Sequence, residues 1–244
     1  MIASGRFEFK YAVSEELAAR ALEWARPFLQ PDRGIHGRQQ VTSLYLDSPA
    51  LSFFRWHCEG ASDRFKLRIR CYGDWPGDHV FAEIKRKKSD VVHKQRARVP
   101  AGALRGVLGG ARCESFGEGG PEALRDFLRK RESFRAAPKI FLRYERDSLR
   151  EKQASGEVAV TVDRNIRCQA ADGFHPLDRD WQAVTLPAPS GFASAILELK
   201  YSVKPPSWMA RLIEYLEPRR VSFSKYRAAV EQHLLSEPAG LIGS

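Results

Sequence analysis

The sequence predicts an α+β fold in which helices cover one face of an antiparallel β-sheet. Two observations support this class. At least seven segments alternate charged and apolar residues, which is the period of a strand with one ionic and one apolar face. Several amphipathic helices need an apolar surface to pack on. The 244 residues suffice for one large domain, which we expect to span residues 1–236, with a disordered tail at 237–244.

The chain is basic, with forty Lys and Arg against thirty Asp and Glu and a net charge of +10. This balance favours an anionic partner such as a nucleotide, polyphosphate, nucleic acid or membrane surface. The first residues lack the pattern of a secretory signal, and no stretch approaches the roughly 20 apolar residues of a membrane span. We therefore expect a soluble, cytoplasmic protein. The four cysteines form no CxxC pair and are expected to be reduced, structural thiols.

Strand and helix patterns alternate through the first part of the chain. Residues 6–11, RFEFKY, predict a strand because charged and aromatic residues alternate there. A helix is expected at 14–28, with Ser14 as its cap and an apolar stripe formed by Leu17, Ala21, Trp24 and Phe28. A strand at 39–48 and a short turn or helical piece at 49–60 follow.

The segment 63–73, DRFKLRIRCYG, is the most informative one. Its four cations alternate with apolar residues, so that like charges crowd one face of a strand. Strands are expected next at 78–88 and 91–99, joined by a hairpin connection at 88–90. The Glu-x-Lys pattern of residues 8–10 returns in the first of these strands at 83–85.

The second half repeats the same kind of pattern. A glycine-rich loop precedes a helix expected at 121–134, and strands are expected at 138–148, 157–168 and 193–203. The last of these strands carries the third Glu-x-Lys pattern, at 198–200. Two more helices are expected at 205–217 and 224–235.

Such a sheet can be completed in two ways. Its charged face can lie in water, as in many antiparallel sheets, or the sheet can curl into a barrel whose ionic faces line a tunnel. The all-cation run at 64–70 favours the tunnel, because a solvated strand face usually mixes charges and uses Ser, Thr and Gln. Glu8, Glu83 and Glu198 each precede a Lys by two residues, as expected where a polyanion and its divalent metal share a site.

These motifs, in this order, resemble the polyphosphate polymerase domain of the vacuolar transporter chaperone (VTC) family, one of the triphosphate tunnel metalloenzymes. The matching stretches are KY at 10–11, SLYLDS at 43–48, KLRIRCYG at 66–73, EIK at 83–85, LRYER at 142–146, VTVDRNI at 160–166, LELKY at 197–201 and FSKY at 223–226. The resemblance implies an antiparallel barrel of about eight strands with a charged interior and helices outside. It also implies a polymerase that uses Mn²⁺ or Mg²⁺ to transfer the terminal phosphoryl group of ATP to inorganic polyphosphate.

Carried over position by position, the resemblance assigns the site residues. The main phosphate-contacting set, which carries catalysis, is Lys10, Arg68, Arg70, Lys85, Arg143 and Lys200. Further phosphate contacts are expected from Arg64, Lys66, Lys94, Arg146, Ser224 and Lys225. The metal is assigned to Glu198, with Glu8 and Glu83 as further candidates. Family members often carry Arg at the position of Ala159, where Arg164 or Arg167 is the candidate replacement.

Three functions stay open at this point: a polyphosphate polymerase, a tunnel enzyme that hydrolyses triphosphate or cyclises ATP, and a binding module without turnover. Hydrolytic relatives often open with Glu-x-Glu-x-Lys, and Arg6 in place of the first carboxylate favours holding a long polyanion. No nucleic acid partner is expected, because no aromatic RNA-recognition signature is present. Glu198 as a structural ion-pair partner and Ser224 as a simple helix cap are the alternatives for those two residues.

Overall fold

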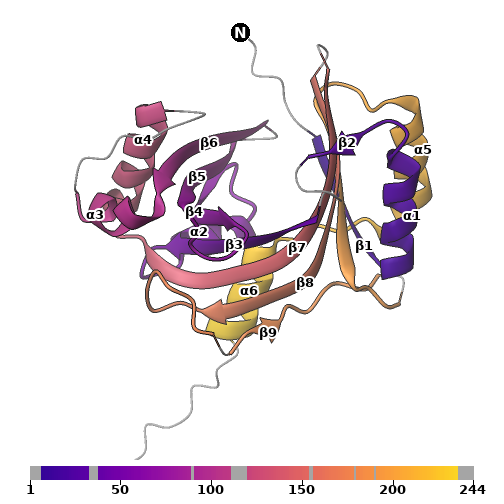
Figure 1. Ribbon diagram of the computed structural model, residues 1–244. Helices are drawn as coiled ribbons and strands as arrows, with labels where there is room; N and C mark the ends of the chain where they lie inside the picture. Colours follow the sequence, from indigo (N-terminus) through magenta and orange to yellow (C-terminus); the bar gives the residue numbers. More distant parts are fainter. Residues whose placement is uncertain are drawn as a thin grey trace, which may run out of the picture. The chain divides into compact units, whose positions relative to one another are not determined.

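The computed structural model describes residues 7–32, 38–88, 91–110, 120–153, 156–178, 180–189 and 191–235 (Figure 1). The chain forms two compact units. Unit 1 comprises Met1–Gln40, Tyr144–Ile166 and Thr185–Phe223, and unit 2 comprises Val41–Arg143, Arg167–Val184 and Ser224–Ser244. Arg6, the hairpin connection near 89–90 and the tail expected at 237–244 lie outside the described residues. The single domain over 1–236 stays a prediction.

One sheet collects the strands in the order β1-β10-β8-β7-β3-β4-β5-β6, and all of the registers described are antiparallel. The main strands are β1 (Phe7–Val13), β3 (Arg38–Asp47), β4 (Asp63–Tyr72), β5 (His79–Lys88), β6 (Val91–Pro100), β7 (Ala137–Gln153), β8 (Gly156–Ala170) and β10 (Ala195–Tyr201). Two short strands, β2 (Gln30–Pro31) and β9 (Gln182–Ala183), pair with β7 and β8. The expected α+β class with a large antiparallel sheet is therefore confirmed.

In unit 1, helices α1 (Glu15–Ala25) and α5 (Ser207–Leu216) pack on the apolar faces of the strands (Figure 1). Ser14 caps α1 as expected, because its side chain accepts a hydrogen bond from the Leu17 N–H. The buried residues of α1 are Ala18, Ala21, Leu22 and Ala25. Their small size lets the helix lie close to the sheet.

The apolar stripe expected on α1 was partly wrong. Trp24 and Phe28 were placed on it, but they are 46% and 45% exposed. The buried stripe is rotated toward the alanines, and the bulky rings stay at its rim. Phe28 stacks there on Trp208, with ring centroids 5.0 Å apart.

In unit 2, the odd-numbered residues of β4 point into a core that helices cover. Phe65, Leu67 and Ile69 are buried there with residues of β3, β5 and β6. The helices of this unit are α2 (Ser52–Cys58), α3 (Leu104–Leu108), α4 (Gly120–Ser133) and α6 (Lys225–Leu234). Because side chains alternate along a strand, the even-numbered cations of β4 lie on the opposite face from this core.

The sheet is open rather than closed into the expected barrel. Its strand order ends at β1 and β6, and no pairing joins these two strands in the part of the chain that the structure describes. The segment that follows α5 instead forms hydrogen bonds with the outer edge of β1. Tyr11 forms an isolated bridge with Arg220, and the Val221 N–H donates to the Lys10 carbonyl at 2.8 Å. Those edge groups are therefore not available for closing the sheet.

Among the described residues, no helix combines the length and the apolar character needed to cross a membrane.

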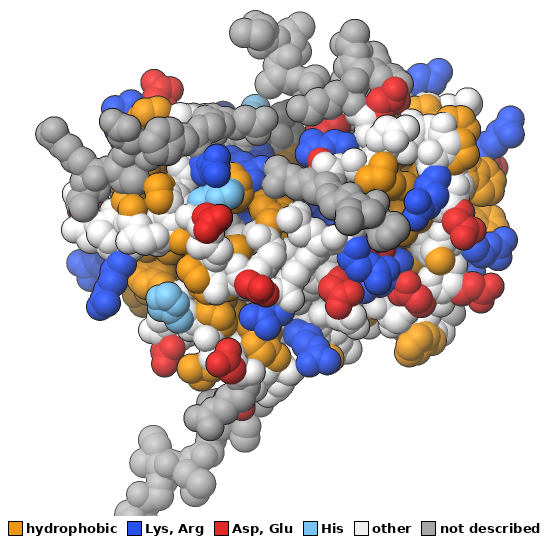
Figure 2. Space-filling model, in the orientation of Figure 1, with side chains coloured by type: hydrophobic (Ala, Val, Ile, Leu, Met, Phe, Trp, Pro, Cys, Tyr) orange, Lys and Arg blue, Asp and Glu red, His pale blue; other side chains and the backbone are white. Residues whose placement is uncertain are grey.

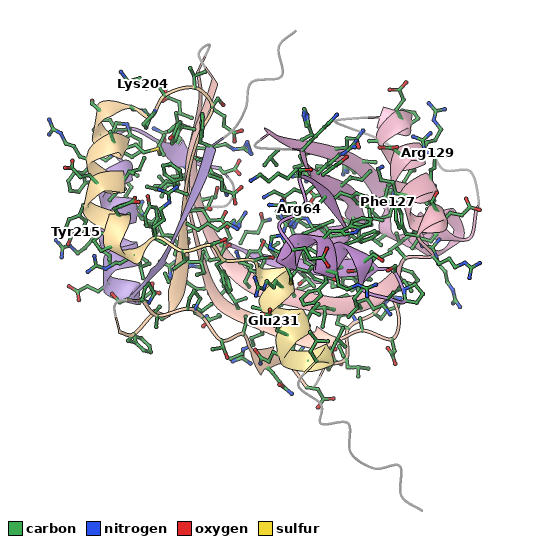
Figure 3. The ribbon with its side chains drawn as sticks, turned by 180° about the vertical axis from the view of Figure 1, so that it is seen from behind. Arg64, Phe127, Arg129, Lys204, Tyr215 and Glu231 are labelled. Atoms are coloured by element: carbon green, nitrogen blue, oxygen red, sulfur yellow. The ribbon has the colours of Figure 1, made fainter. Side chains whose placement is uncertain are left out.

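Helix α4 offers a matched pair of residues that tests this packing. Phe127 is 0% exposed in the core of unit 2, whereas Arg129 points away from it, with 75% of its side chain exposed (Figure 3). We expect Phe127→Ala to lower the free energy of unfolding by about 3–5 kcal/mol. Arg129→Ala should change it by less than about 0.5 kcal/mol, because Arg129 contributes only a surface ion pair. Urea denaturation measures both, and equal effects would contradict the assigned faces of α4.

Candidate functional site

Strands β4, β5 and β6 present a face of unit 2 that we call the cationic face. It carries Arg64, Lys66, Arg68 and Arg70 of β4, Glu83 and Lys85 of β5, and Lys94 and Arg96 of β6. The register places Lys66 opposite Lys85, and Lys85 opposite Lys94, so three like charges lie side by side across the strands. On the surface shown in Figure 2, by contrast, basic and acidic side chains are mixed.

A single carboxylate, Glu83, neutralises part of this charge. It is 0% exposed, and Arg68 Nε donates to its Oε2 at 2.6 Å. Its Oε1 lies 2.9 Å from Lys94 Nζ and 3.6 Å from Arg96 Nε. Burial raises the pKa of Glu83, but Arg68, Arg70 and Lys94 outweigh burial and hold the pKa well below its usual range. Glu83 is therefore an ionised counterion at any ordinary pH.

Strand β3 orients two of the cations from the neighbouring position in the sheet. Arg70, only 5% exposed, donates from Nε to Ser43 Oγ at 3.0 Å, and Arg68 donates from Nη1 to the Tyr45 hydroxyl at 3.2 Å. The register Ser43–Arg70 and Tyr45–Arg68 makes both contacts direct cross-strand pairs. The two guanidinium groups are thus held in place before any ligand binds.

The first turn of α6 brings two further predicted residues to this face. Lys66 Nζ donates to Ser224 Oγ at 2.8 Å, and Ser224 also caps α6 by accepting from the Arg227 N–H at 3.3 Å. The helix-cap alternative for Ser224 is therefore correct, and its phosphate contact stays a prediction. Burial raises the pKa of Tyr45, but Arg68, Arg70 and also Lys225 lower it below its ordinary value, so the charge of Lys225 acts here too.

Arg64, at the end of the same row and labelled in Figure 3, donates instead to the carbonyl of Ala61, which precedes β4.

Arg96 is a candidate that the family resemblance did not select. Its guanidinium carbon lies 3.5 Å from the centroid of the Phe81 ring and 5.5 Å from that of Tyr72. Its Nε and Nη2 are buried, and no hydrogen bond satisfies them. Glu83 Oε1 approaches Nε only to 3.6 Å, so these buried nitrogens could donate to an anion bound on this face. The sequence signal was the alternation of Lys94, Arg96 and Arg98 along β6.

Unit 1 contains a second ionic cluster, around Glu198 of β10. This carboxylate, 4% exposed, forms an ion pair with Lys200 of the same strand and lies 3.9 Å from Lys10 Nζ and 3.6 Å from Arg146 Nη2. Lys200 Nζ donates to Thr161 Oγ1 at 3.2 Å. The register pairs Glu8 with Lys200 and Lys10 with Glu198, so positive and negative charges alternate across β1 and β10. The ion pair considered for Glu198 is thus present.

The structure separates Arg143 from Arg146 on β7. Three residues apart on a strand, the two side chains point to opposite faces. Arg146 makes a two-pronged ion pair with Asp163, at 2.6 and 2.7 Å, and approaches Glu198. Arg143 lies over the Trp181 ring, 4.2 Å from its centroid. Arg146, which the sequence ranked second, is therefore the arginine of this motif that joins the ionic cluster.

The position of Ala159 is opposite Lys200 on β8. Arg164 does not replace a missing arginine there, because an odd separation turns it to the other face, where it pairs with Glu15 and Asp147. Arg167 lies eight residues along the strand, exposed, opposite Ala183 of β9.

The carboxylates can be tested for their fit to a divalent metal. In the described residues, no group of three or more His, Cys, Asp and Glu side chains is placed to hold a metal ion by itself. Mg²⁺ commonly takes only one or two carboxylates and completes its shell with water and substrate phosphates. Glu198 and Glu8, on one face of neighbouring strands, fit that requirement. Glu83 fits it less well, because its fully buried carboxylate has no second carboxylate beside it among the described residues of the cationic face.

Comparison with known proteins identifies the family. The family described as the VTC domain matches residues 5–234, nearly the whole chain. The chain belongs to the VTC domain family. The resemblance drawn from the sequence motifs is therefore confirmed, and the cationic face is a feature of a VTC domain. A comparison with curated proteins found no match.

Two solved structures are similar to this VTC domain. A candidate adenylate cyclase from Bacillus halodurans matches with a TM-score of 0.50 and 12% sequence identity, over 90% of this chain and 95% of that one. A candidate adenylyl cyclase from Hippeastrum, described as having a dominant triphosphatase activity, matches with a TM-score of 0.48 and 14% identity, over 95% and 98% of the two chains. At such identities the similarity concerns the fold alone.

The titration of Lys94 predicts how anion binding depends on pH. Desolvation, with Arg68 and Arg70 nearby, lowers the pKa of Lys94 to about 8 against the opposing effect of Glu83. A bound anion favours the charged ammonium, so affinity is full below this pKa and falls as the pH rises through it. We expect tripolyphosphate to bind wild type about 10-fold more weakly at pH 9 than at pH 7 for this reason.

The matched control is Lys94→Arg, whose guanidinium stays charged. It should lose much less affinity over the same range, and titration of the ligand itself is common to both proteins. Calorimetry at the two pH values measures the difference. Identical pH profiles for wild type and Lys94→Arg would show that Lys94 does not face the anion.

Proposed function

We propose that this VTC domain is a metal-dependent polyphosphate polymerase, which transfers the terminal phosphoryl group of ATP to a growing polyphosphate chain. The observation that carries the proposal is the cationic face of unit 2. There seven Lys and Arg side chains share one strand face with a single, fully buried carboxylate. Arg96 adds buried nitrogens that no hydrogen bond satisfies. This is the chemistry expected of a site for a highly charged phosphate chain.

Phosphoryl transfer suits such residues, because it needs little covalent help from the protein. It needs the phosphates held in line and the charge on the transferring oxygens neutralised. Arg68 and Arg70 supply planar groups with two donors each, already oriented by Tyr45 and Ser43. Lys66, Lys85 and Lys94 supply compact point charges.

The state of the carboxylates favours a phosphate acceptor over water. Activating water calls for a base, and a carboxylate surrounded by cations is a weak one. Glu83 contacts three cations, Glu198 contacts three, and Asp163 is held by Arg146. The end of a polyphosphate chain is already an anion and needs no base. In these two clusters, the chemistry therefore supports transfer to phosphate.

The divalent metal would be held by Glu198, with Glu8 as a second ligand, together with phosphate oxygens of the substrate. When bound, the metal would neutralise charge on the phosphates and so assist the departure of the leaving group. Lys10, Arg146 and Lys200 would then turn from Glu198 toward phosphate. A closed tunnel around the substrate, which the family resemblance implies, stays a prediction.

Product analysis decides among the reactions. We expect the protein, given ATP with Mn²⁺ or Mg²⁺, to form chains of polyphosphate that gel electrophoresis resolves and an exopolyphosphatase removes. Release of free phosphate alone would mean hydrolysis, and formation of cyclic AMP would mean cyclisation. Binding of tripolyphosphate without any turnover would mean a binding module. Each of these three outcomes contradicts the polymerase.

Two substitutions separate binding from chemistry. Glu198→Gln keeps the cations and removes the carboxylate proposed for the metal, so tripolyphosphate affinity should change less than about 3-fold while turnover falls at least about 100-fold. Arg70→Ala should weaken binding at least about 10-fold as well as lowering the rate, because a charged donor is lost.

Calorimetry without metal and Mn²⁺-dependent consumption of ATP give the two readouts. Arg129→Ala, which removes an exposed cation of α4, is the control for loss of positive charge and should match wild type in both. Near wild-type turnover of Glu198→Gln would exclude Glu198 as the metal ligand.

A further inference from the structure

A buried carboxylate, Asp47, joins two helices of unit 2 at the end of β3. It is 0% exposed, and it accepts hydrogen bonds from the Ser48, Phe53 and Phe54 N–H groups at 2.7, 2.9 and 2.9 Å. These bonds cap α2, whose own N-cap residue, Leu51, offers no side-chain bond. The fourth donor comes from α6: the Tyr226 hydroxyl donates to Asp47 Oδ2 at 2.6 Å.

Tyr226 also links α6 to the cationic face. Its ring stacks on that of Tyr45, with centroids 4.8 Å apart and planes 15° apart, and Lys66 Nζ lies 5.9 Å from the centroid of Tyr226. Tyr45 in turn accepts a hydrogen bond from Arg68. Ser224 and Lys225, immediately before Tyr226, form the start of α6 and contact the same face through Lys66 and through the field at Tyr45. The contacts of Tyr226 are therefore among those that fix where these two residues lie.

We propose that Tyr226 is a positioning residue, which fixes the first turn of α6 through its bond to Asp47 and so holds Lys225 and Ser224 ready for phosphate. The inference rests on the proposed phosphate-binding function of this face. Without the hydroxyl bond, the first turn of α6 would keep its helical capping and the Lys66–Ser224 bond, but it would lose the bond that ties it to Asp47 and so be placed less firmly against β4. Part of the binding free energy would then be spent on ordering Lys225.

Tyr226→Phe tests the proposal with the smallest change, since it keeps the ring stack on Tyr45 and the three backbone bonds to Asp47. We expect tripolyphosphate to bind roughly 3- to 10-fold more weakly, because only part of the free energy of one hydrogen bond to a charged group would be drawn from binding. The control is Tyr11→Phe, which removes a buried tyrosine hydroxyl in unit 1 that makes no hydrogen bond, and it should bind as wild type does. Circular dichroism melting confirms that both variants are folded.

A double-mutant cycle separates positioning from a general loss of stability. If Tyr226 acts by placing Lys225, then Tyr226→Phe should change affinity less than about 2-fold in a Lys225→Ala background. In a Lys85→Ala background, where the removed cation lies on β5, the full 3- to 10-fold effect should remain. A hydroxyl that matters only for stability would give the same effect in both backgrounds.

The outcomes separate failure of the proposed phosphate binding from failure of the positioning role of Tyr226. Failure of wild type to bind tripolyphosphate contradicts the proposed function itself. Binding by wild type with unchanged affinity in Tyr226→Phe, or equal effects in both backgrounds, overturns the positioning role and leaves the proposed function standing. Loss of affinity that disappears only with Lys225→Ala supports it.

Discussion

The interaction on which the cationic face depends is the set of ion pairs around Glu83. Two like charges about 4 Å apart repel by roughly 4 kcal/mol at the effective dielectric typical near a protein surface. A row of cations on β4 facing others on β5 and β6 would therefore oppose folding. Glu83, fully buried at the centre of the row, offsets this with contacts to Arg68, Lys94 and Arg96. Removing such a buried partner typically costs about 3–5 kcal/mol.

One carboxylate offsets only part of the positive charge. The positive charge that remains would serve the proposed binding of phosphate. The sheet keeps its cations together because hydrophobic packing on the opposite face, from Phe65, Leu67 and Ile69, holds β4 in register whatever its ionic face carries. The apolar face of the strands therefore supplies stability, and the cationic face supplies the proposed phosphate contacts. Burial, with Arg68 and Arg70 nearby, lowers the pKa of Lys94, and a bound polyanion would favour its charged form.

Much of the fold was predictable, because it rests on local patterns. Period-two alternation located the long strands, and Ser14 located the start of α1. The predictions of the fold that were wrong depended on residues distant in sequence. The rotation of α1 that exposes Trp24 is set by the strands beneath it, and the bonds at the edge of β1 come from Arg220 and Val221, far along the chain. Neither is visible in a window of a few residues.

The site residues also divide into those that local patterns predict and those that depend on partners distant in sequence. Alternation identified the cations of β4 and β5, and Glu198 with Lys200, because charge type and spacing lie in the sequence itself. Parity alone separates Arg143 from Arg146, but the choice between them needs the pairing of β7 with β8. Ala159, Thr161 and Asp163 of β8 share one face, and only the β7 side chains that reach it can meet Asp163, as Arg146 does. Arg96 needed the register, which sets it opposite Glu83.

The two clusters differ in how they would respond to a ligand. Around Glu198, each negative charge already has a positive neighbour, so phosphate must compete with ion pairs before it gains contacts. On the cationic face, phosphate meets an excess of positive charge and buried donors of Arg96 that lack an acceptor. Affinity is then expected to come mainly from unit 2. The cluster around Glu198 gains most when a metal brings positive charge to its carboxylates and frees Lys10, Arg146 and Lys200. Metal dependence should accordingly appear in turnover more than in binding.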